Sequence, residues 1–275
     1  MTDKEILPEN HPRAESLKIR HTLIEGFEKG IVAIAGLIAH GRGEAFDYLL
    51  GEKTIKSAYN ATKSAVASLL LAEKPVISVN GNVTALMAKD LAFLSNKTGI
   101  PLEINLFYRS RERELKILRE LERYGAKNVL GVDLDYRAEL EAIKHLRRYV
   151  DSRGILNADV VVVMLEDGDR TMALRAMDKK VIAVDLNPLS RTALAANITI
   201  VDNIIRTIPL LGEIYSEIKE YSNKELKAIV DSYNHISTLK DALTHMAISN
   251  ERINEQLREV NLQIERKKEQ IKNKK

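Results

Sequence analysis

The sequence contains no cysteine. This absence excludes disulfide bonds, a thiolate nucleophile and zinc sites with sulfur ligands. The sequence also has no run of about 18 consecutive apolar residues and no basic segment followed by an apolar leader, so we expect neither a membrane span nor a signal peptide. These absences predict a cytoplasmic protein.

Aromatic residues are scarce, and neither sign of charge is in large excess. Phe, Trp and Tyr make up 5% of the chain, and 42 Lys and Arg are nearly balanced by 39 Asp and Glu, for a net charge of +3. A nucleic-acid-binding surface needs concentrated positive charge and, for single strands, aromatic stacking platforms. We therefore expect no nucleic-acid partner, whereas small anionic ligands are compatible with this composition.

Several signatures of common enzymes are missing. No Gly-x-Gly-x-x-Gly follows the first predicted strand, which disfavours a standard dinucleotide dehydrogenase. The stretch Gly51-Glu52-Lys53-Thr54 resembles part of a P-loop, but Glu52 interrupts the motif and no strand precedes it. There is no Gly-x-Ser-x-Gly elbow and no His-Glu-x-x-His helix, which removes the commonest hydrolase and zinc-peptidase hypotheses.

Apolar residues, in contrast, are plentiful: 45% of the 275 residues are hydrophobic, enough for a full core. From Pro75 onwards, short apolar runs alternate with amphipathic segments, and we interpret the runs as buried strands. These runs are Val76–Val79, Leu102–Phe107, Val129–Asp133, Val160–Leu165, Val181–Leu186 and Ile198–Val201. The alternation predicts an α/β fold with a mostly parallel, Rossmann-like sheet and helices on both faces.

Helices are expected both before the first strand and between the strands. Apolar periodicity and capping residues mark them. We expect a polar arm over residues 1–11 and helices near Arg13–Gly30, Ser57–Leu71, Val83–Ser95 and Arg111–Tyr124, the last with Ser110 as its N-cap.

Polar residues gather where the predicted strands end. The clusters are Asn80–Asn82, Tyr108–Arg111, Asp133–Asp135, Glu166–Arg170, Asp185–Arg191 and Asp202-Asn203. Each cluster by itself also fits a turn, a helix cap or a solvated loop. Parallel strands bring their carboxyl ends to one edge of the sheet, so together the clusters favour a ligand site there.

The stretch Gly36–Glu52 combines glycines with a cation. Gly41 and Gly43 flank Arg42, which predicts an anion-binding loop in which backbone N–H groups and a guanidinium approach the same phosphate or carboxylate. This loop should open a helix that Gly51 caps. The alternative is a surface turn whose glycines serve only its geometry. His40 fits a local hydrogen-bonding residue better than a catalytic base.

The C-terminal region is strongly charged and helical from Ser222, where Ser222 and Glu225 have the spacing of a capping box. Apolar residues then follow steps of four and three, interrupted by two polar ones, at Leu239, Leu243, Met246, Asn250, Ile253, Leu257, Val260, Ile264, Lys267 and Ile271. This heptad seam predicts a self-association helix, and a helix folded back on its own domain is the alternative. We therefore divide the chain into an α/β domain over 1–222, with N-terminal helices, and a coiled-coil-like segment over 223–275.

Several segments together resemble one family. The matching segments are His11-Pro12-Arg13, Gly36–Glu52, Val79–Asn82, Glu166–Thr171 and Asp185–Thr192. They resemble the archaeal 4-phosphopantoate-beta-alanine ligases, also called phosphopantothenate synthetases. The resemblance implies a homodimeric enzyme of coenzyme A biosynthesis that joins 4-phosphopantoate to beta-alanine through an acyl adenylate, while ATP becomes AMP and pyrophosphate. The protein's task is then mainly positioning and charge neutralisation.

The same resemblance implies site residues. Arg20 and Arg42 would hold the ATP phosphates, with Arg42 as the catalytic residue. The nucleoside would lie against Asp185, Leu186, Asn187, Arg191, Thr192, Asn203 and Ile204. Strand-end candidates for the other substrate are Asn80, Gly81, Asn82, Arg109 and Arg170, with Arg111 as a further phosphate candidate.

Two questions stay open at this level. Magnesium is expected to be carried mainly by the ATP phosphates, with Asp167 or Asp169 as candidate ligands. Two other function classes remain as alternatives: a non-catalytic nucleotide-binding sensor with a coiled-coil output, and an atypical Rossmann oxidoreductase.

Overall fold

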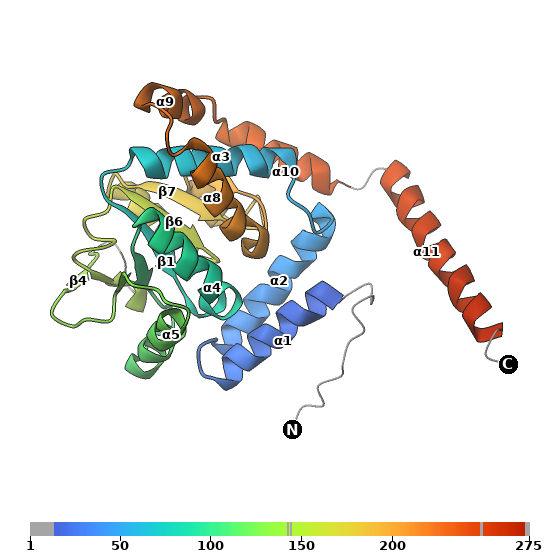
Figure 1. Cartoon of the computed structure of the whole chain (residues 1–275), viewed down its shortest axis with the longest axis horizontal. Coiled ribbons are helices and arrows are strands. Elements are labelled where there is room, and N and C mark those ends of the chain that lie inside the picture. The colour runs from blue at the N-terminus through green and yellow to red at the C-terminus, as the bar shows by residue number, and fades with distance from the viewer. Residues whose placement is uncertain (1–13, 142, 144, 248–249, 273–275) are drawn as a thin grey trace.

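The computed structural model describes residues 14–141, 143, 145–247 and 250–272 (Figure 1). The polar arm expected over residues 1–11 and the His11-Pro12-Arg13 motif lie outside this range. The elements are α1 (Ala14–Glu28), α2 (Ile34–Leu50), α3 (Lys56–Leu71), β1 (Pro75–Val79), α4 (Gly81–Thr98), β2 (Leu102–Ile104), α5 (Arg111–Arg123), β3 (Val129–Leu130), β4 (Arg137–Glu139), a 3₁₀ turn (Leu146–Arg148), β5 (Tyr149–Asp151), β6 (Val160–Met164), α6 (Gly168–Ala176), β7 (Lys180–Val184), α7 (Arg191–Ala195), β8 (Ile198–Ile200), α8 (Ile204–Ile218), α9 (Asn223–Asp231), α10 (His235–Met246) and α11 (Asn250–Lys272).

All six predicted strands are present and form one parallel sheet. Its order is β3-β2-β1-β6-β7-β8. After β1, strands β2 and β3 are added on one side of it. The chain then crosses to the other side of β1 and adds β6, β7 and β8. The carboxyl ends of β1 and β6 therefore form the switch point at which such sheets bind ligands.

The sheet is buried on both faces, which explains its nearly continuous apolar strands. In β6, Val160, Val162 and Met164 join the core under α3, α4, α5 and α8, while Val161 and Val163 face the second core under α6 and the segment 140–158. Strand β5 lies in that segment and pairs antiparallel with β4, which directly precedes the segment, and the sequence analysis predicted neither strand. Both strands are three residues long, too short for a periodic signal.

The loop predicted around Arg42 is wrong. Helix α2 is continuous from Ile34 to Leu50 and includes Gly36, Gly41 and Gly43. A glycine inside a helix costs about 1 kcal/mol relative to alanine, but packing overrides this preference. A Cβ on Gly36 would lie 2.2 Å from Oδ1 of Asn82, so glycine lets α2 lie against the start of α4. Gly51 ends the helix with a φ of 81°, as predicted.

The predicted heptad seam is divided between two helices, and so the expectation of one continuous helix is wrong. The capping box of Ser222 and Glu225 starts α9 as predicted. Helix α10 ends at Met246, and Leu239 and Met246 are buried in the main core, so α10 folds back on the α/β body. Helix α11 lies apart from that body in Figure 1.

The exposed part of the seam lies on α11. Ile253, Leu257, Val260 and Ile264 are all exposed there. The side chain of Asn250 lies outside what the structure describes. The division of the chain at residue 222 stays a prediction. In the described part of the chain, no helix combines the length and the apolar character that crossing a membrane requires.

Candidate functional site

A cavity of about 300 Å³ lies at the switch point of the sheet. Its walls come from the carboxyl ends of β1, β2 and β6, from α2, and from the first turns of α4 and α5. The residues that line it are Ala33, Ala35, Gly36, Ala39, His40, Arg42, Asn80, Gly81, Asn82, Leu106, Phe107, Tyr108, Arg113, Arg147, Leu165, Glu166 and Asp167. The structure therefore brings together Arg42 and the predicted substrate residues Asn80, Gly81 and Asn82.

Asn80, directly after β1, connects the end of β1 to the end of β6 at the floor of this cavity. Its Oδ1 accepts from the Val83 N–H at 3.2 Å and caps α4, while its Nδ2 donates to the Met164 carbonyl at 2.9 Å. Leu165 follows with a φ of 50°, a left-handed conformation that is uncommon for a residue other than glycine. Asn80 thus holds a strained strand end in place, which gives it a structural role whatever it binds.

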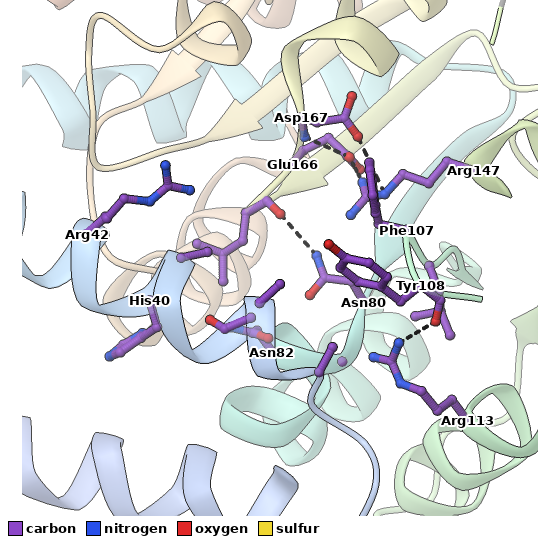
Figure 2. A pocket seen from close by; sticks show the side chains of 17 residues that line it. His40, Arg42, Asn80, Asn82, Phe107, Tyr108, Arg113, Arg147, Glu166 and Asp167 are labelled. Carbon is purple, nitrogen blue, oxygen red and sulfur yellow. Dashed lines mark hydrogen bonds and ion pairs between the residues drawn. The ribbon is translucent and has the colours of Figure 1, made fainter. Parts of the chain in front are cut away.

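Arg42 stands at one side of the cavity, is exposed to solvent, and has no counter-ion among the described residues. Its side chain projects from α2 and makes no hydrogen bond or ion pair with any residue in the described ranges (Figure 2). His40 lies beside it on the same helix, and burial lowers the pKa of this imidazole below its usual value. The cavity therefore holds a neutral histidine and a cation without a counter-ion at this side.

Arginines also line the opposite side of the cavity (Figure 2). Nη2 of Arg113 donates to the Ile31 carbonyl at 2.9 Å, and its Nη1 donates to the Tyr108 carbonyl. Burial lowers the pKa of Arg113. Its Nε is buried and has no hydrogen-bond partner within the described part of the chain. This guanidinium is therefore held by neutral carbonyl groups, and no carboxylate among the described residues pairs with it.

Arg147 approaches the same side from the 3₁₀ turn and contacts Glu166. Arg170 contacts the same carboxylate from α6, and its side chain is fully buried. Burial, and then repulsion from Arg170, lowers the pKa of Arg147 to about 9. The acidic loop predicted after β6 is therefore not simply solvated, because Glu166 lies between two buried arginines.

The residues predicted to bind the nucleoside gather at the neighbouring ends of β7 and β8, outside the cavity. Asp185 accepts from the Asn187 N–H at 2.9 Å and from the Ser190 hydroxyl at 2.5 Å, and burial raises its pKa. Thr192 donates to the Glu166 carbonyl at 3.0 Å. Arg191 pairs with Asp169 at 2.8 Å on the surface. Tertiary structure thus brings this group together, while its role in nucleotide binding stays a prediction.

Helix α2 crosses from the cavity to this second group. Asp47 accepts from Nδ2 of Asn203, the cap of α8, at 2.7 Å, and Arg206 contacts both Asp47 and Asp202. A Cβ on Gly43 would lie 3.6 Å from Leu186. Arg42 lines the cavity and the next residue, Gly43, adjoins Leu186 after β7, so this turn of α2 borders both groups.

Three predicted cations form ion pairs within the protein. Arg20, predicted to hold the ATP phosphates, pairs with Glu44 at 3.0 Å, while its side chain stays 38% exposed. Arg109 is mostly buried, contacts Glu114 and donates to the Tyr149 and Gly131 carbonyls at 2.7 Å and 3.0 Å. Arg111 also pairs with Glu114, at 3.3 Å. None of these three cations lines the cavity, and neither does the fully buried Arg170.

The two aspartates named as magnesium candidates both contact other residues of the protein. In the ranges that the structure describes, no three His, Asp or Glu side chains are grouped so that they could hold a metal ion. Asp169 is paired with Arg191, and Asp167 caps α6 by accepting from the Arg170 N–H at 2.9 Å. Both aspartates thus have protein partners, and a role for either as a magnesium ligand stays a prediction.

Sequence reasoning missed Arg113 and Arg147. Arg113 lies in the first turn of α5, where the helix dipole disfavours a cation, and that unfavourable position was a usable signal. Arg147 lies in a segment with no apolar period, so nothing in its neighbourhood marked it.

Comparison with known proteins adds the chemistry. The family model described as phosphopantothenate/pantothenate synthetase matches residues 57–249. A protein of Thermococcus kodakarensis is 54% identical over 241 residues, covering 87% of this chain and 92% of that protein. A Methanosarcina mazei protein is 47% identical over 246 residues, covering 90% of this chain and 95% of that protein. Both relatives are named 4-phosphopantoate--beta-alanine ligase.

Proposed function

We propose, since this chain belongs to the phosphopantothenate/pantothenate synthetase family, that it joins 4-phosphopantoate to beta-alanine and consumes ATP in doing so. The products are 4'-phosphopantothenate, AMP and pyrophosphate, and the setting is coenzyme A biosynthesis in the cytoplasm. The relatives named as ligases support this reaction over a nucleotide sensor or an oxidoreductase.

The position of Arg42 supports the proposal most strongly. This unpaired cation lies between the cavity at the switch point and the polar ends of β7 and β8. An enzyme that transfers an adenylyl group to a carboxylate must bring these two ligands together, with a cation near the phosphates between them. The cavity holds the acid, and the β7–β8 edge holds the nucleoside.

The chemistry has two steps. A carboxylate oxygen of 4-phosphopantoate attacks the α-phosphorus of ATP, the bond to the β-phosphate breaks, and pyrophosphate leaves. The amine of beta-alanine then attacks the acyl carbon, the bond to the adenylate oxygen breaks, and AMP leaves. Arg42 stabilises the negative charge that develops on the phosphates in the first step. Arg20 assists through Nη1, since its contacts with Glu44 use Nε and Nη2.

Magnesium enters this scheme as a companion of the nucleotide. Mg²⁺ is commonly bound through substrate phosphates, its own waters and one or two carboxylates. Among the described residues no three side chains are grouped to hold a metal ion, so Mg²⁺ would be carried mainly by the ATP phosphates and its own waters.

The assembly is proposed to be a homodimer that binds small molecules and needs neither nucleic acid nor a membrane. The exposed seam on α11, which begins directly after the last residue matched by the family model, supplies an association surface.

An isotope experiment tests the reaction. The full chain is incubated with ATP, beta-alanine and 4-phosphopantoate carrying ¹⁸O in its carboxylate. An acyl adenylate transfers one labelled oxygen to AMP. Label in inorganic phosphate, with ADP as the other product, would show an acyl phosphate instead. Reactions that each lack one substrate are the controls, and amide formation without ATP would contradict the proposal.

A further inference from the structure

We propose that Arg113, with the first turn of α4 beside it, binds the phosphate of 4-phosphopantoate and thereby sets the enzyme's preference for the phosphorylated acid. The inference rests on the proposed function for the identity of the substrate. It replaces Arg109, Arg111 and Arg170, which are committed to other partners and do not line the cavity. Arg147 completes the same end of the cavity.

The charge of Arg113 is the first support. Two of its N–H groups donate to the Ile31 and Tyr108 carbonyls, and no carboxylate in the described ranges pairs with it. A partly buried cation without a counter-ion is costly, which is the reason that burial lowers its pKa. A dianionic phosphate at this position removes that cost and forms charge-assisted hydrogen bonds with the remaining N–H groups.

The start of α4 is the second support. Asn80 caps the helix through the Val83 N–H, while the N–H groups of Gly81 and Asn82 donate to no residue in the part of the chain that the structure describes. A Cβ on Gly81 would lie 3.0 Å from Nη2 of Arg113. The guanidinium and the positive end of an 18-residue helix thus adjoin each other, a combination suited to a phosphate.

Arg147 is the third support. Its side chain is 7% exposed, and its Nε is buried without a hydrogen-bond partner among the described residues. It shares Glu166 with Arg170, and its Nε lies 3.6 Å from Asp167, so two buried arginines face two carboxylates at this end of the cavity. Burial, and then repulsion from Arg170, lowers the pKa of Arg147, and an added anion stabilises its charged form.

The shape of the cavity fixes the orientation of the substrate. 4-Phosphopantoate carries its phosphate and its carboxylate at opposite ends of a short chain with a dimethyl carbon between them. Arg113 and Arg147 lie on one side of the cavity and Arg42 on the other (Figure 2). Ala35, Ala39, Leu106 and Leu165 supply apolar surface for the dimethyl carbon. With the phosphate at Arg113, the carboxylate faces Arg42 and the nucleotide.

The test compares kcat/KM for 4-phosphopantoate and for pantoate in wild type, Arg113→Gln and Arg113→Lys. Wild type should prefer the phosphorylated acid by at least about 100-fold. In Arg113→Gln, KM for 4-phosphopantoate should rise about 10- to 100-fold, with KM for ATP, KM for beta-alanine and the weak use of pantoate unchanged. Arg113→Lys keeps the charge but loses the planar fork, so its preference should fall between those of the other two.

The matched control is Arg123→Gln on the same helix, where the arginine is 63% exposed and pairs with Glu120. It should leave every constant unchanged. Equal losses for 4-phosphopantoate and pantoate in Arg113→Gln would overturn the subsite and leave the ligase activity standing. Should that variant fail to fold in a melting experiment, Arg113→Lys decides, because an unchanged preference there overturns the subsite as well.

Calorimetry of 4-phosphopantoate and pantoate binding, without ATP, separates the subsite from the reaction. Wild type should bind the phosphorylated acid more tightly, and Arg113→Gln should lose most of that difference. This result would support the subsite even if no amide product formed, an outcome that counts against the proposed function alone. Equal binding of the two acids by wild type would overturn the subsite.

Discussion

Asn82 of α4 donates a hydrogen bond of 2.8 Å from its Nδ2 to the carbonyl of Gly36 on α2. The contact joins the helix that carries Arg42 to the helix that starts at the cavity floor. It is possible because Gly36 has no side chain, since a Cβ there would lie 2.2 Å from Asn82 Oδ1. The position of Arg42 over the cavity thus depends on a glycine six residues before it.

This contact predicts opposite effects for two glycines of one helix. Gly36→Ala should lower the free energy of unfolding by about 1 to 3 kcal/mol, the usual cost of overpacking. A Cβ on Gly41 would meet no atom within 4 Å, so Gly41→Ala should raise stability by about 0.5 to 1 kcal/mol through helix propensity. Urea unfolding of both variants checks the pair, and equal effects would contradict the packing argument.

Arg42→Ala should cost about 2 to 4 kcal/mol of transition-state stabilisation, or roughly 30- to 1,000-fold in kcat, the scale for one preorganised donor. Its melting temperature should stay close to that of wild type, because Arg42 contacts no partner in the described part of the chain. Arg119→Ala, at an exposed position of α5, is the control. Normal turnover by Arg42→Ala would remove this residue from the mechanism.

Glu103 should make stability depend on pH. Burial raises its pKa from 4.5 to about 7, while the N–H groups of Asp151 and Ile155 donate to its carboxylate. Between these two pKa values the folded chain holds a proton that the unfolded chain has lost. The free energy of unfolding should therefore fall as pH rises through this window, by up to about 1.4 kcal/mol per pH unit.

Glu103→Gln removes that titration. At low pH the free energy of unfolding of this variant should be smaller than that of wild type. The difference between the two should shrink as pH rises toward neutrality. Urea titrations across this range measure the difference, with Glu73→Gln at an exposed position as the control. A deficit that is constant with pH would show that Glu103 does not titrate in this window.

The predicted self-association through the heptad seam now concerns α11 alone, because α10 packs in the core. Truncation before Leu239 would remove buried core residues, so the informative truncation ends at Ala247 and should weaken self-association without unfolding the body. Leu257 and Leu262 offer a matched pair of exposed leucines, of which Leu257 lies on the seam. Leu257→Asn should reduce the mass measured by light scattering, and Leu262→Asn should not. An unchanged mass after truncation would place the contact in the α/β body.

The sequence by itself determined the sheet and the edge at which the site lies. The six strands were readable because each is an apolar run buried on both faces, as Val160–Met164 shows. The cluster at Asn80–Asn82 was readable because a polar turn must follow each strand. These signals are local, and neighbouring residues along the chain carry them.

Tertiary structure alone decided which cations are available to a ligand. Arg109, Arg113 and Arg170 look alike in the sequence, but Glu114 and Glu166 occupy the first and the last, whereas Arg113 meets the carbonyl of Ile31, 82 residues away. Packing also made α2 a straight helix despite its glycines. Glu114 and Glu166 lie close in sequence to the arginines that they pair with, but Arg113 is directly next to Glu112 and Glu114 and pairs with neither. Sequence proximity therefore does not record which guanidinium keeps an uncompensated charge, because the fold decides which pairs form.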